Sequence, residues 1–102
     1  MIISSGYNIA GPEVEAALLS HESVAECAVI GVPDDERGSI VEAHVVLRNA
    51  KPTPETIKAL QDHVKAAIAP YKYPRSVCFC SELPKTQTGK IQRYLLRQNA
   101  KH

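Results

Sequence analysis

Residues 24–47 read VAECAVIGVPDDERGSIVEAHVVL, and this stretch decides the fold class. Its two arms, residues 24–32 and 40–47, are apolar and rich in β-branched side chains, which predicts two strands. Every other residue from Val41 to Leu47 is apolar, as expected for a strand with one buried face. Two aspartates and a glycine between the arms indicate a turn.

Helix signals flank these strands. The run GPE at residues 11–13 begins a first helix that ends near Ser20, because proline and acidic side chains favour a first turn. Thr53 is the predicted cap of a second helix, Pro54 is its first residue, and Pro70 ends it. Apolar residues share one face of each helix: Val14, Ala17 and Leu18 in the first, and Ile57, Leu60, Val64 and Ile68 in the second.

The C-terminal third continues the alternation of elements. Residues 71–75, YKYPR, are predicted to be extended because of neighbouring prolines, and residues 77–80 form a third strand. A last helix is expected from about Gly89, with Ile91, Tyr94 and Leu95 inward. The predicted fold is therefore α+β, a small three-stranded, mostly antiparallel sheet packed by about three helices, in a single domain of residues 1–102.

The composition is that of a small soluble globular unit. With 102 residues, of which 44% are hydrophobic and 23% charged, the chain supports one modest core. The net charge of +1 argues against a general attraction to nucleic acid or to membranes, and no apolar run is long enough to span a bilayer. Three cysteines, an odd number, favour a reducing compartment over a disulfide framework, with the cytoplasm as the default.

The most informative functional signal is residues 83–93, LPKTQTGKIQR. A proline-stiffened, hydroxyl-rich loop presents the pair Gly89-Lys90 at the start of a basic helix. Glycine lets the backbone approach a ligand and lysine adds a compact charge, so the pair suits phosphate or carboxylate oxygens. A nucleotide-binding P-loop would need glycine at Pro84 and a hydroxyl residue at Ile91, which excludes that motif. A solvated turn with a surface lysine is the alternative.

The run from Pro84 to Arg93 resembles the last core motif of the acyl-adenylate-forming enzymes. This superfamily includes AMP-forming acyl-CoA synthetases, peptide-synthetase adenylation domains and firefly-type luciferases. Residues 5–15, SGYNIAGPEVE, are similar to the motif that opens the small C-terminal domain of these enzymes. Residues 21–38 follow the same pattern, so the resemblance extends over essentially the whole chain. It implies a mobile C-terminal domain whose large N-terminal domain is absent.

The resemblance assigns catalysis to Lys90, which follows Gly89. This lysine would bridge the substrate carboxylate and the phosphate oxygens of ATP, positioning two reactants that repel each other and stabilising charge at the α-phosphorus. The intact enzyme would convert a carboxylic acid and Mg-ATP into acyl-AMP and then transfer the acyl group to CoA. The implied cofactors are therefore ATP, Mg²⁺ and CoA, none of them held tightly by this chain alone.

A second implied surface binds CoA. Gly6 would line a tunnel for the pantetheine arm, with Tyr7 at its border, because a thin tunnel needs backbone without a side chain. Tyr71, Lys72 and Arg75 match a segment that meets the nucleotide part of CoA, with an aromatic face for adenine and cations for phosphates. A strand entrance with solvated charges is the alternative. After adenylation the domain would rotate, so that Lys90 leaves the active site and the CoA-binding surface with Gly6 enters it.

Residues 2–13, IISSGYNIAGPE, most resemble ligases for benzoate-type acids, 2-aminobenzoate among them, which implies an aromatic substrate. Two other functions would use the same motifs. One is an adenylation module that serves a carrier protein, and the other is a non-catalytic module that binds a nucleotide or an acidic partner. The isolated chain is expected to be inactive as a ligase, because half of each site is missing.

Other polar residues are predicted to be structural. A basic stripe at helical spacing, with a solvated helix face as the alternative, comprises Lys90, Arg93, Arg97 and Lys101. Arg93 is also a candidate to brace the motif loop. Cys78 and Cys80 share one face of a strand and are expected to be small core residues. The four histidines lack metal-ligand spacing with one another or with the cysteines, so no metal site is predicted.

Overall fold

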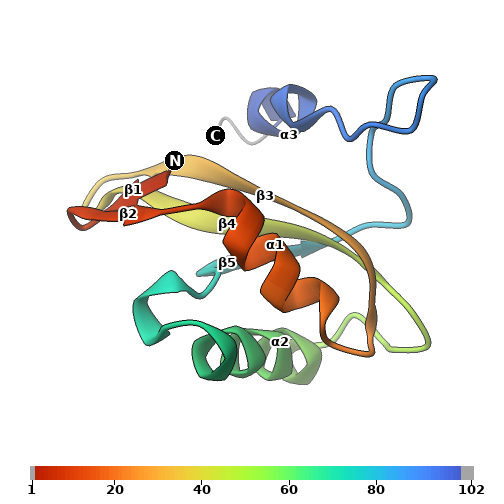
Figure 1. The fold of residues 1–102 in the computed structure, drawn as a ribbon, viewed down its shortest axis with the longest axis horizontal. Helices are drawn as coiled ribbons and strands as arrows, with labels where there is room; N and C mark the ends of the chain where they lie inside the picture. Colours follow the sequence, from red (N-terminus) through yellow and green to blue (C-terminus); the bar gives the residue numbers. More distant parts are fainter. Residues whose placement is uncertain (1, 100–102) are drawn as a thin grey trace.

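The computed structural model describes residues 2–99 and has three layers, with a sheet between two helical layers (Figure 1). The three-stranded sheet has the order β3 (Val24–Asp34), β4 (Gly38–Leu47), β5 (Ser76–Phe79). Helices α1 (Gly11–Leu19) and α2 (Pro54–Ala67) cover one face, and α3 (Arg93–Asn99) lies over the other. The remaining elements are the strands β1 (Ile2–Ser4) and β2 (Tyr7–Ile9) and the 3₁₀ helix η1 (Pro70–Lys72). The predicted α+β class with three helices is confirmed.

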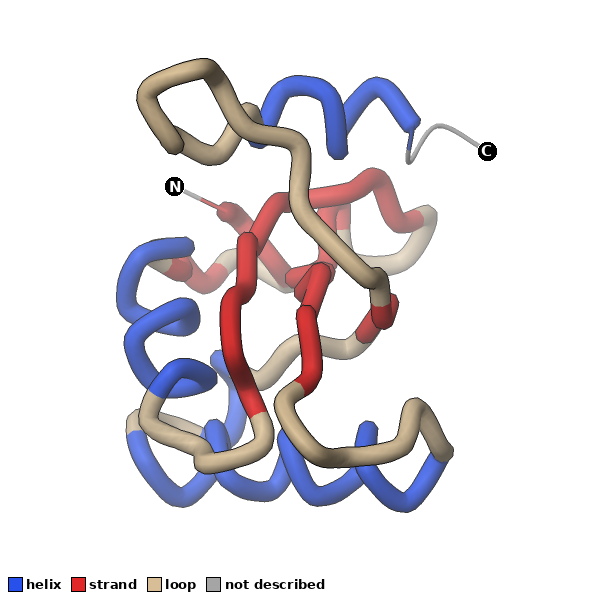
Figure 2. Tube along the Cα trace, turned by 90° about the vertical axis from the view of Figure 1, so that its right-hand side faces the viewer, coloured by secondary structure: helices blue, strands red, loops and turns tan. Residues whose placement is uncertain are grey.

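The central sheet is mixed. β3 and β4 form an antiparallel hairpin in which Asp34 pairs with Gly38, as residues 24–47 predict. β5 pairs with β4 in parallel, with His44 opposite Cys78. A parallel neighbour requires a crossover connection, and α2 supplies it between β4 and β5 (Figure 2). The described part of the chain therefore has two antiparallel pairings, β1–β2 and β3–β4, and one parallel pairing.

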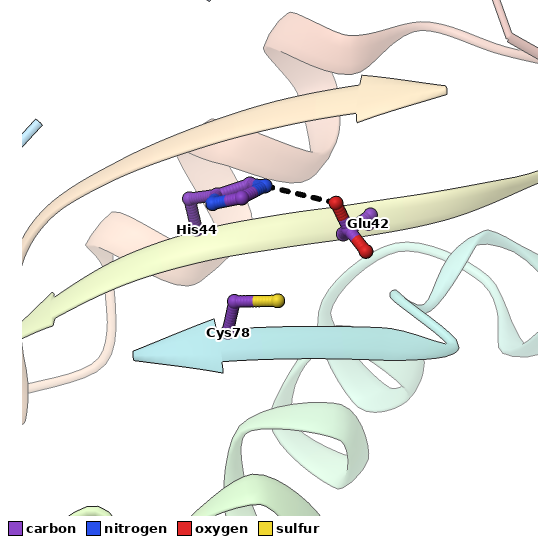
Figure 3. A group of neighbouring side chains, drawn as sticks. All are labelled: Glu42, His44 and Cys78. Atoms are coloured by element: carbon purple, nitrogen blue, oxygen red, sulfur yellow. Dashed lines mark hydrogen bonds and ion pairs between the residues drawn. The ribbon is translucent and has the colours of Figure 1, made fainter. Parts of the chain in front are cut away.

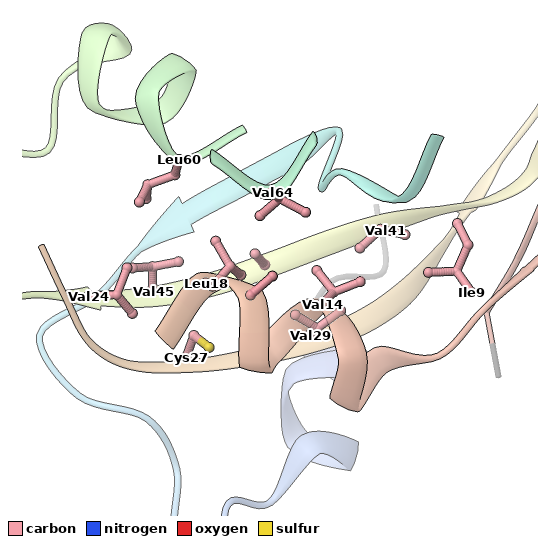
Figure 4. Packing of buried hydrophobic residues seen from close by; sticks show 12 residues of the cluster. Ile9, Val14, Leu18, Val24, Cys27, Val29, Val41, Val45, Leu60 and Val64 are labelled. Atoms are coloured by element: carbon pink, nitrogen blue, oxygen red, sulfur yellow. The ribbon is translucent and has the colours of Figure 1, made fainter. Parts of the chain in front are cut away.

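The main core lies between the sheet and the helices α1 and α2 (Figure 4). Leu18 of α1 and Leu60 and Val64 of α2 are completely buried there. They pack against alternate residues of the strands, which include Cys27, Val29, Val41, Ala43 and Val45. The predicted start of α2 is confirmed. Thr53 Oγ1 accepts a hydrogen bond from the Thr56 N–H at 3.3 Å, and Pro54 is the first helical residue.

A second, smaller cluster occupies the opposite face of β3. Its buried residues are Ala28, Ile30, Val32, Leu83 and Leu96. Leu83 precedes the motif loop and Leu96 belongs to α3, so the C-terminal segment covers this face of β3. The side chains of β3 are consequently buried on both faces. The same face of β4 carries Glu42 and His44 between the apolar residues Ile40 and Val46.

Residues 2–9 form the β1–β2 hairpin, an element that no pattern in the sequence predicted. Two predictions about local structure, for residues 71–72 and for Tyr94, were wrong. Residues 71 and 72 belong to η1 and are not extended, because Pro70 starts a turn closed by the Lys72 N–H and the Ala69 carbonyl oxygen at 3.1 Å. Tyr94 is 52% exposed, and Leu96 takes the inward position on α3. Over residues 2–99, the helices are all too short or too polar to cross a bilayer.

Candidate functional site

Lys90 lies in a closed loop between β5 and α3. Lys85 and Ile91 form an antiparallel bridge at the base of this loop. Beside the bridge, the Gln92 N–H donates to the Pro84 carbonyl oxygen at 2.8 Å. Lys90 is the residue before Ile91, and its side chain is exposed. The loop therefore holds its backbone in a defined shape while leaving the ammonium group accessible.

Hydrogen bonds accepted by Thr86 keep Lys90 in a loop and out of the helix that follows. The Thr86 carbonyl oxygen accepts from the Gly89 N–H at 3.0 Å, and Thr86 Oγ1 accepts from the Lys90 N–H at 3.1 Å. Gly89 has a φ of +88°, which an α-helix does not allow. The helix predicted from about Gly89 was therefore wrong at its start, since α3 begins at Arg93. Lys90 precedes the helix and does not occupy its first turn.

The loop is anchored on two other elements. Lys85 makes an ion pair with Glu26 of β3. Arg93 makes a two-bond ion pair with Glu15 of α1, in which Nε donates to Oε2 at 2.9 Å and Nη2 donates to Oε1 at 2.6 Å. The hydrogen bonds that Arg93 donates to Glu15 raise the pKa of its guanidinium. Leu83 is buried at the start of the segment. The base of the Lys90 loop is thus tied to the core from both ends.

Gly6 lies in the turn of the β1–β2 hairpin. Ser5 and Gly6 have φ values of +51° and +83°, and Ser4 pairs with Tyr7, which describes a two-residue turn with both central residues left-handed. The Ser5 N–H donates to the Arg37 carbonyl oxygen at 3.0 Å, which docks the turn on the β3–β4 turn. A Cβ at Gly6 would have no atom within 4 Å. The turn therefore presents bare backbone to solvent.

The structure brings Tyr7 and Tyr71 together, although 64 positions separate them in the sequence numbering. Their rings stack with centroids 4.4 Å apart and planes inclined by 28°. Lys72 Nζ lies 5.7 Å from the Tyr71 centroid and makes an ion pair with Glu13 Oε1 at 2.6 Å. This hydrogen bond to Glu13 raises the pKa of Lys72. The hairpin turn and η1 therefore form one surface, defined here as the Tyr7–Tyr71 surface, comprising Gly6, Tyr7, Tyr71 and Lys72.

Arg75 belongs to a different cluster. Its Nη1 donates to the Tyr73 hydroxyl at 2.8 Å, and its guanidinium carbon lies 4.9 Å from the Tyr73 centroid. Lys65 Nζ lies 4.3 Å from the same ring. Tyr73 is thus enclosed by two cations. The five residues expected to contact CoA are therefore divided between the Tyr7–Tyr71 surface and the Tyr73 cluster.

The Lys90 loop and the Tyr7–Tyr71 surface lie at opposite ends of the molecule. In Figure 1 the β1–β2 turn and η1 are on the left, and the blue loop before α3 is on the right. The sheet runs between them. Lys90 and Gly6 therefore cannot face one compact ligand at the same time.

The predicted basic stripe does not form as one row. Lys90 lies in the loop, Arg93 turns toward Glu15, and Arg97 is exposed on α3. Lys101 lies outside the described residues. The alternative in which Arg93 braces the motif loop agrees with its ion pair to α1.

One group of polar residues escaped the sequence analysis. Glu42, His44 and Cys78 point toward one another from β4 and β5 (Figure 3), and their potential ligand atoms all lie within 4.8 Å. Burial and the negative charge of Glu42 raise the pKa of the Cys78 thiol. Spacing along the chain could not reveal the group, because it depends on the parallel register of β5. Cys80, by contrast, packs against the smaller apolar cluster, as expected of a core residue.

Comparison with known proteins agrees with this architecture. The family model for the AMP-binding enzyme C-terminal domain matches residues 13–90. The uncharacterized acyl-CoA ligase YtcI of Bacillus subtilis is 56% identical over 99 residues, a match that covers 96% of this chain and 19% of that protein. This chain therefore spans about a fifth of the length of that curated relative.

Two solved structures extend the likeness to three dimensions. The crystal structure of an acyl-CoA synthetase from Brucella canis has 50% identity and a TM-score of 0.94, over 96% of this chain and 18% of that one. The anthranilate CoA ligase AuaEII, in complex with anthranoyl-AMP, has 43% identity and a TM-score of 0.89, over 99% of this chain and 20% of that one.

Proposed function

The chain belongs to the family of AMP-binding enzyme C-terminal domains, and from this premise we propose that it is the mobile C-terminal domain of an AMP-forming acid–CoA ligase. The ligase would join a carboxylic acid to ATP, giving acyl-AMP and pyrophosphate. It would then transfer the acyl group to the thiol of CoA and release AMP. Residues 1–102 would form one domain, and a larger N-terminal domain would supply the ATP-binding loop and the acyl pocket.

The observation that carries this proposal is the separation of the Lys90 loop from the Tyr7–Tyr71 surface. They lie at opposite ends of the molecule, with the β3–β4–β5 sheet between them (Figure 1). An active site in a partner domain could meet only one of them at a time. Rotation of this domain would therefore assemble an adenylation site and a thioester-forming site in turn.

Lys90 would act in the first half-reaction. Its ammonium group would contact the substrate carboxylate and the α-phosphate, two anions that otherwise repel each other. The same charge would stabilise the transition state as negative charge grows on the phosphate oxygens. The hydrogen bonds that Thr86 accepts from Gly89 and Lys90, together with the ion pair between Arg93 and Glu15, would hold the loop in place, so that little reorganisation is needed.

The Tyr7–Tyr71 surface would act in the second half-reaction. The bare backbone at Gly6 leaves room for the thin pantetheine arm, because no side chain projects there. The exposed ring of Tyr71 offers a stacking face for adenine. Lys72 would exchange its partner Glu13 for a phosphate, and Arg75 would contribute charge nearby. The Lys90 loop would therefore bind the acid and ATP, and the Tyr7–Tyr71 surface would bind CoA.

Mg²⁺ would enter the reaction bound to ATP. The loop from Pro84 to Gln92 carries hydroxyl, amide and ammonium groups and no carboxylate. Such groups do not form the carboxylate sites that proteins use for Mg²⁺. The residues of this loop therefore do not fit the ion, which would be held by phosphates and by the N-terminal domain.

We also propose an aromatic carboxylic acid as the substrate. The support is the similarity to the anthranilate CoA ligase, at 43% identity, together with the benzoate-ligase character of residues 2–13. The acyl pocket would lie in the N-terminal domain. A panel of benzoates and medium-chain fatty acids, offered to the full-length enzyme, tests the substrate class directly.

The central experiment uses the full-length enzyme that contains this chain and measures its two half-reactions separately. Lys90→Ala should lower acyl-AMP formation by about 100-fold or more, because one preorganised charge is lost. Thioester formation from supplied acyl-AMP and CoA should stay close to wild type. Lys90→Arg should restore part of the first activity, since it keeps the charge.

Lys58→Ala is the matched control, because Lys58 is an exposed lysine on α2. It should leave both half-reactions unchanged. If both half-reactions survive Lys90→Ala, the Lys90 loop is structural and the interaction-module alternative takes precedence. Use of a carrier protein in place of CoA would identify the other alternative. Acid-dependent AMP formation by the isolated chain would contradict the requirement for a second domain.

A further inference from the structure

Glu42, His44 and Cys78 form a half-buried polar cluster on the face of the sheet that is turned away from α1 and α2 (Figure 3). Glu42 and His44 are two residues apart on β4, so their side chains project from the same face. Cys78 lies directly opposite His44 on β5. Three different potential ligands therefore converge from two hydrogen-bonded strands, which hold their backbones in fixed register.

The charge of Glu42 makes this cluster unusual. Within residues 2–99, Glu42 is the one charged residue that is buried, with 6% of its surface exposed. Other acidic side chains of this region, such as Glu13, Glu15 and Glu26, are paired with lysine or arginine. The basic partner of Glu42 is His44, whose Nε2 lies 2.9 Å from Oε2. The structure thus gives this buried carboxylate no lysine or arginine partner within residues 2–99, and a metal cation at this point would compensate its charge.

We propose that Glu42, His44 and Cys78 bind a divalent transition-metal ion, with Zn²⁺ as the best match. Zinc accepts carboxylate, imidazole and thiolate ligands together, with a fourth position open to water. A tetrahedral zinc ion with ordinary bond lengths separates its ligand atoms by roughly 3.3–3.6 Å. The present separations range from 2.9 Å for the Glu42–His44 pair to at most 4.8 Å. The three ligand atoms would therefore have to shift by only about 1 Å to reach these separations.

Ser76 completes the arrangement. Its Oγ donates to Glu42 Oε1 at 2.9 Å, which leaves Oε2 directed toward His44. Hydrogen bonds of this kind orient carboxylate ligands in metal sites. On binding, the Cys78 thiol would release its proton to solvent, and His44 Nε2, which now donates to Glu42 Oε2, would give up its proton and coordinate the metal while the imidazole carries its proton on Nδ1. The metal would clamp the edge strand β5 to β4, next to the segment that leads to the Lys90 loop.

The test uses the chain after removal of metals with a chelator and after circular dichroism has shown that it is folded. Zn²⁺ should bind with a stoichiometry of one in calorimetry. In the same molecule, Zn²⁺ should slow the alkylation of Cys78 by about 10-fold or more, as expected when a reactive thiolate becomes a ligand. Cys80, two residues further along the same face, should be unaffected. This readout needs no substitution and therefore does not depend on the folding of a variant.

Cobalt provides the second readout, because a thiolate ligand gives Co²⁺ an intense charge-transfer absorption. Cys78→Ser should abolish this absorption, and Cys80→Ser should retain it. His44→Gln should weaken Zn²⁺ binding by about 10–100-fold or more, judged from the effect of losing even an outer-shell partner. Substitution of His63, which contacts His21 at a distant site, should have no effect.

Three results would overturn the proposal. They are the absence of Zn²⁺ binding, equal protection of Cys78 and Cys80, and binding that is lost in His63→Gln but kept in Cys78→Ser. None of them bears on the ligase activity, since the cluster is separate from both the Lys90 loop and the Tyr7–Tyr71 surface. The proposed function can therefore stand or fall independently.

Discussion

Arg93 and Glu15 are 78 residues apart in the sequence and form a two-bond ion pair, with N···O distances of 2.9 and 2.6 Å. Glu15 Oε2 also accepts from the Val29 N–H at 2.8 Å. One carboxylate therefore connects α1, β3 and the first residue of α3. Because the loop that carries Lys90 ends at Arg93, this ion pair sets where the loop meets the core.

Removal of Arg93 should destabilise the chain more than removal of its exposed neighbour Arg97. Arg93→Ala leaves the partly buried carboxylate of Glu15 short of two donors, which predicts a loss of about 1–3 kcal/mol in the free energy of unfolding. Arg93→Lys should recover part of it, since lysine keeps the charge but not the forked geometry. Urea unfolding measures the free energy of unfolding of each variant. If Arg97→Ala loses as much of it as Arg93→Ala, the ion pair contributes nothing specific to stability.

Gly6 and Gly38 provide a matched test of the CoA surface. Both have a positive φ, of +83° and +80°, and both have open space where a Cβ would stand. Alanine at either position should cost about 1–2 kcal/mol through backbone strain. In the full-length enzyme, Gly6→Ala alone should slow thioester formation from supplied acyl-AMP. A similar slowing in Gly38→Ala would assign the effect to stability.

The stack between Tyr7 and Tyr71 should matter for CoA. Tyr71→Ala removes the exposed ring and should raise the KM for CoA by about 10-fold, the effect of losing one stacked base. Tyr71→Phe should retain wild-type KM, because the ring is kept. Tyr94→Ala is the control, since Tyr94 is an exposed tyrosine on α3. An unchanged KM in Tyr71→Ala would place adenine elsewhere.

The cysteines should differ in reactivity. Burial, and then the charge of Glu15, raises the pKa of Cys27 from 9.0 to about 12. Because the thiolate is the reactive form, a higher pKa means slower alkylation at a given pH. In the folded, metal-free chain at pH 8, iodoacetamide should modify Cys78 and Cys80 before Cys27. Mass spectrometry of digested samples measures each rate, and the difference should vanish in urea.

Local signals in the sequence were sufficient for much of the fold. The apolar arms of residues 24–47 predicted β3 and β4, because strand periodicity and turn composition depend on adjacent residues. Thr53 and Pro54 predicted the start of α2 for a similar reason. Gly89 and Lys90 marked the motif loop, and the resemblance to adenylate-forming enzymes identified the family.

Residue spacing did not predict the elements whose position depends on contacts outside the local sequence. The strands of the β1–β2 hairpin are three residues each, too short for a periodic pattern. The start of α3 moved to Arg93 because Thr86 captures the N–H groups of Gly89 and Lys90. Such hydrogen bonds outweigh the weak helix preference of a few residues.

The sequence by itself determined the strands β3, β4 and β5, the first two helices and the loop of Lys90, since these follow from the chemistry of neighbouring residues. Only the tertiary structure decided which distant side chains meet. Tyr7 stacks on Tyr71, and Cys78 lies beside His44, because the hairpin docks near η1 and β5 pairs in parallel with β4. The physical reason is that a strand register or a docking position depends on packing of the whole core, which no local pattern encodes.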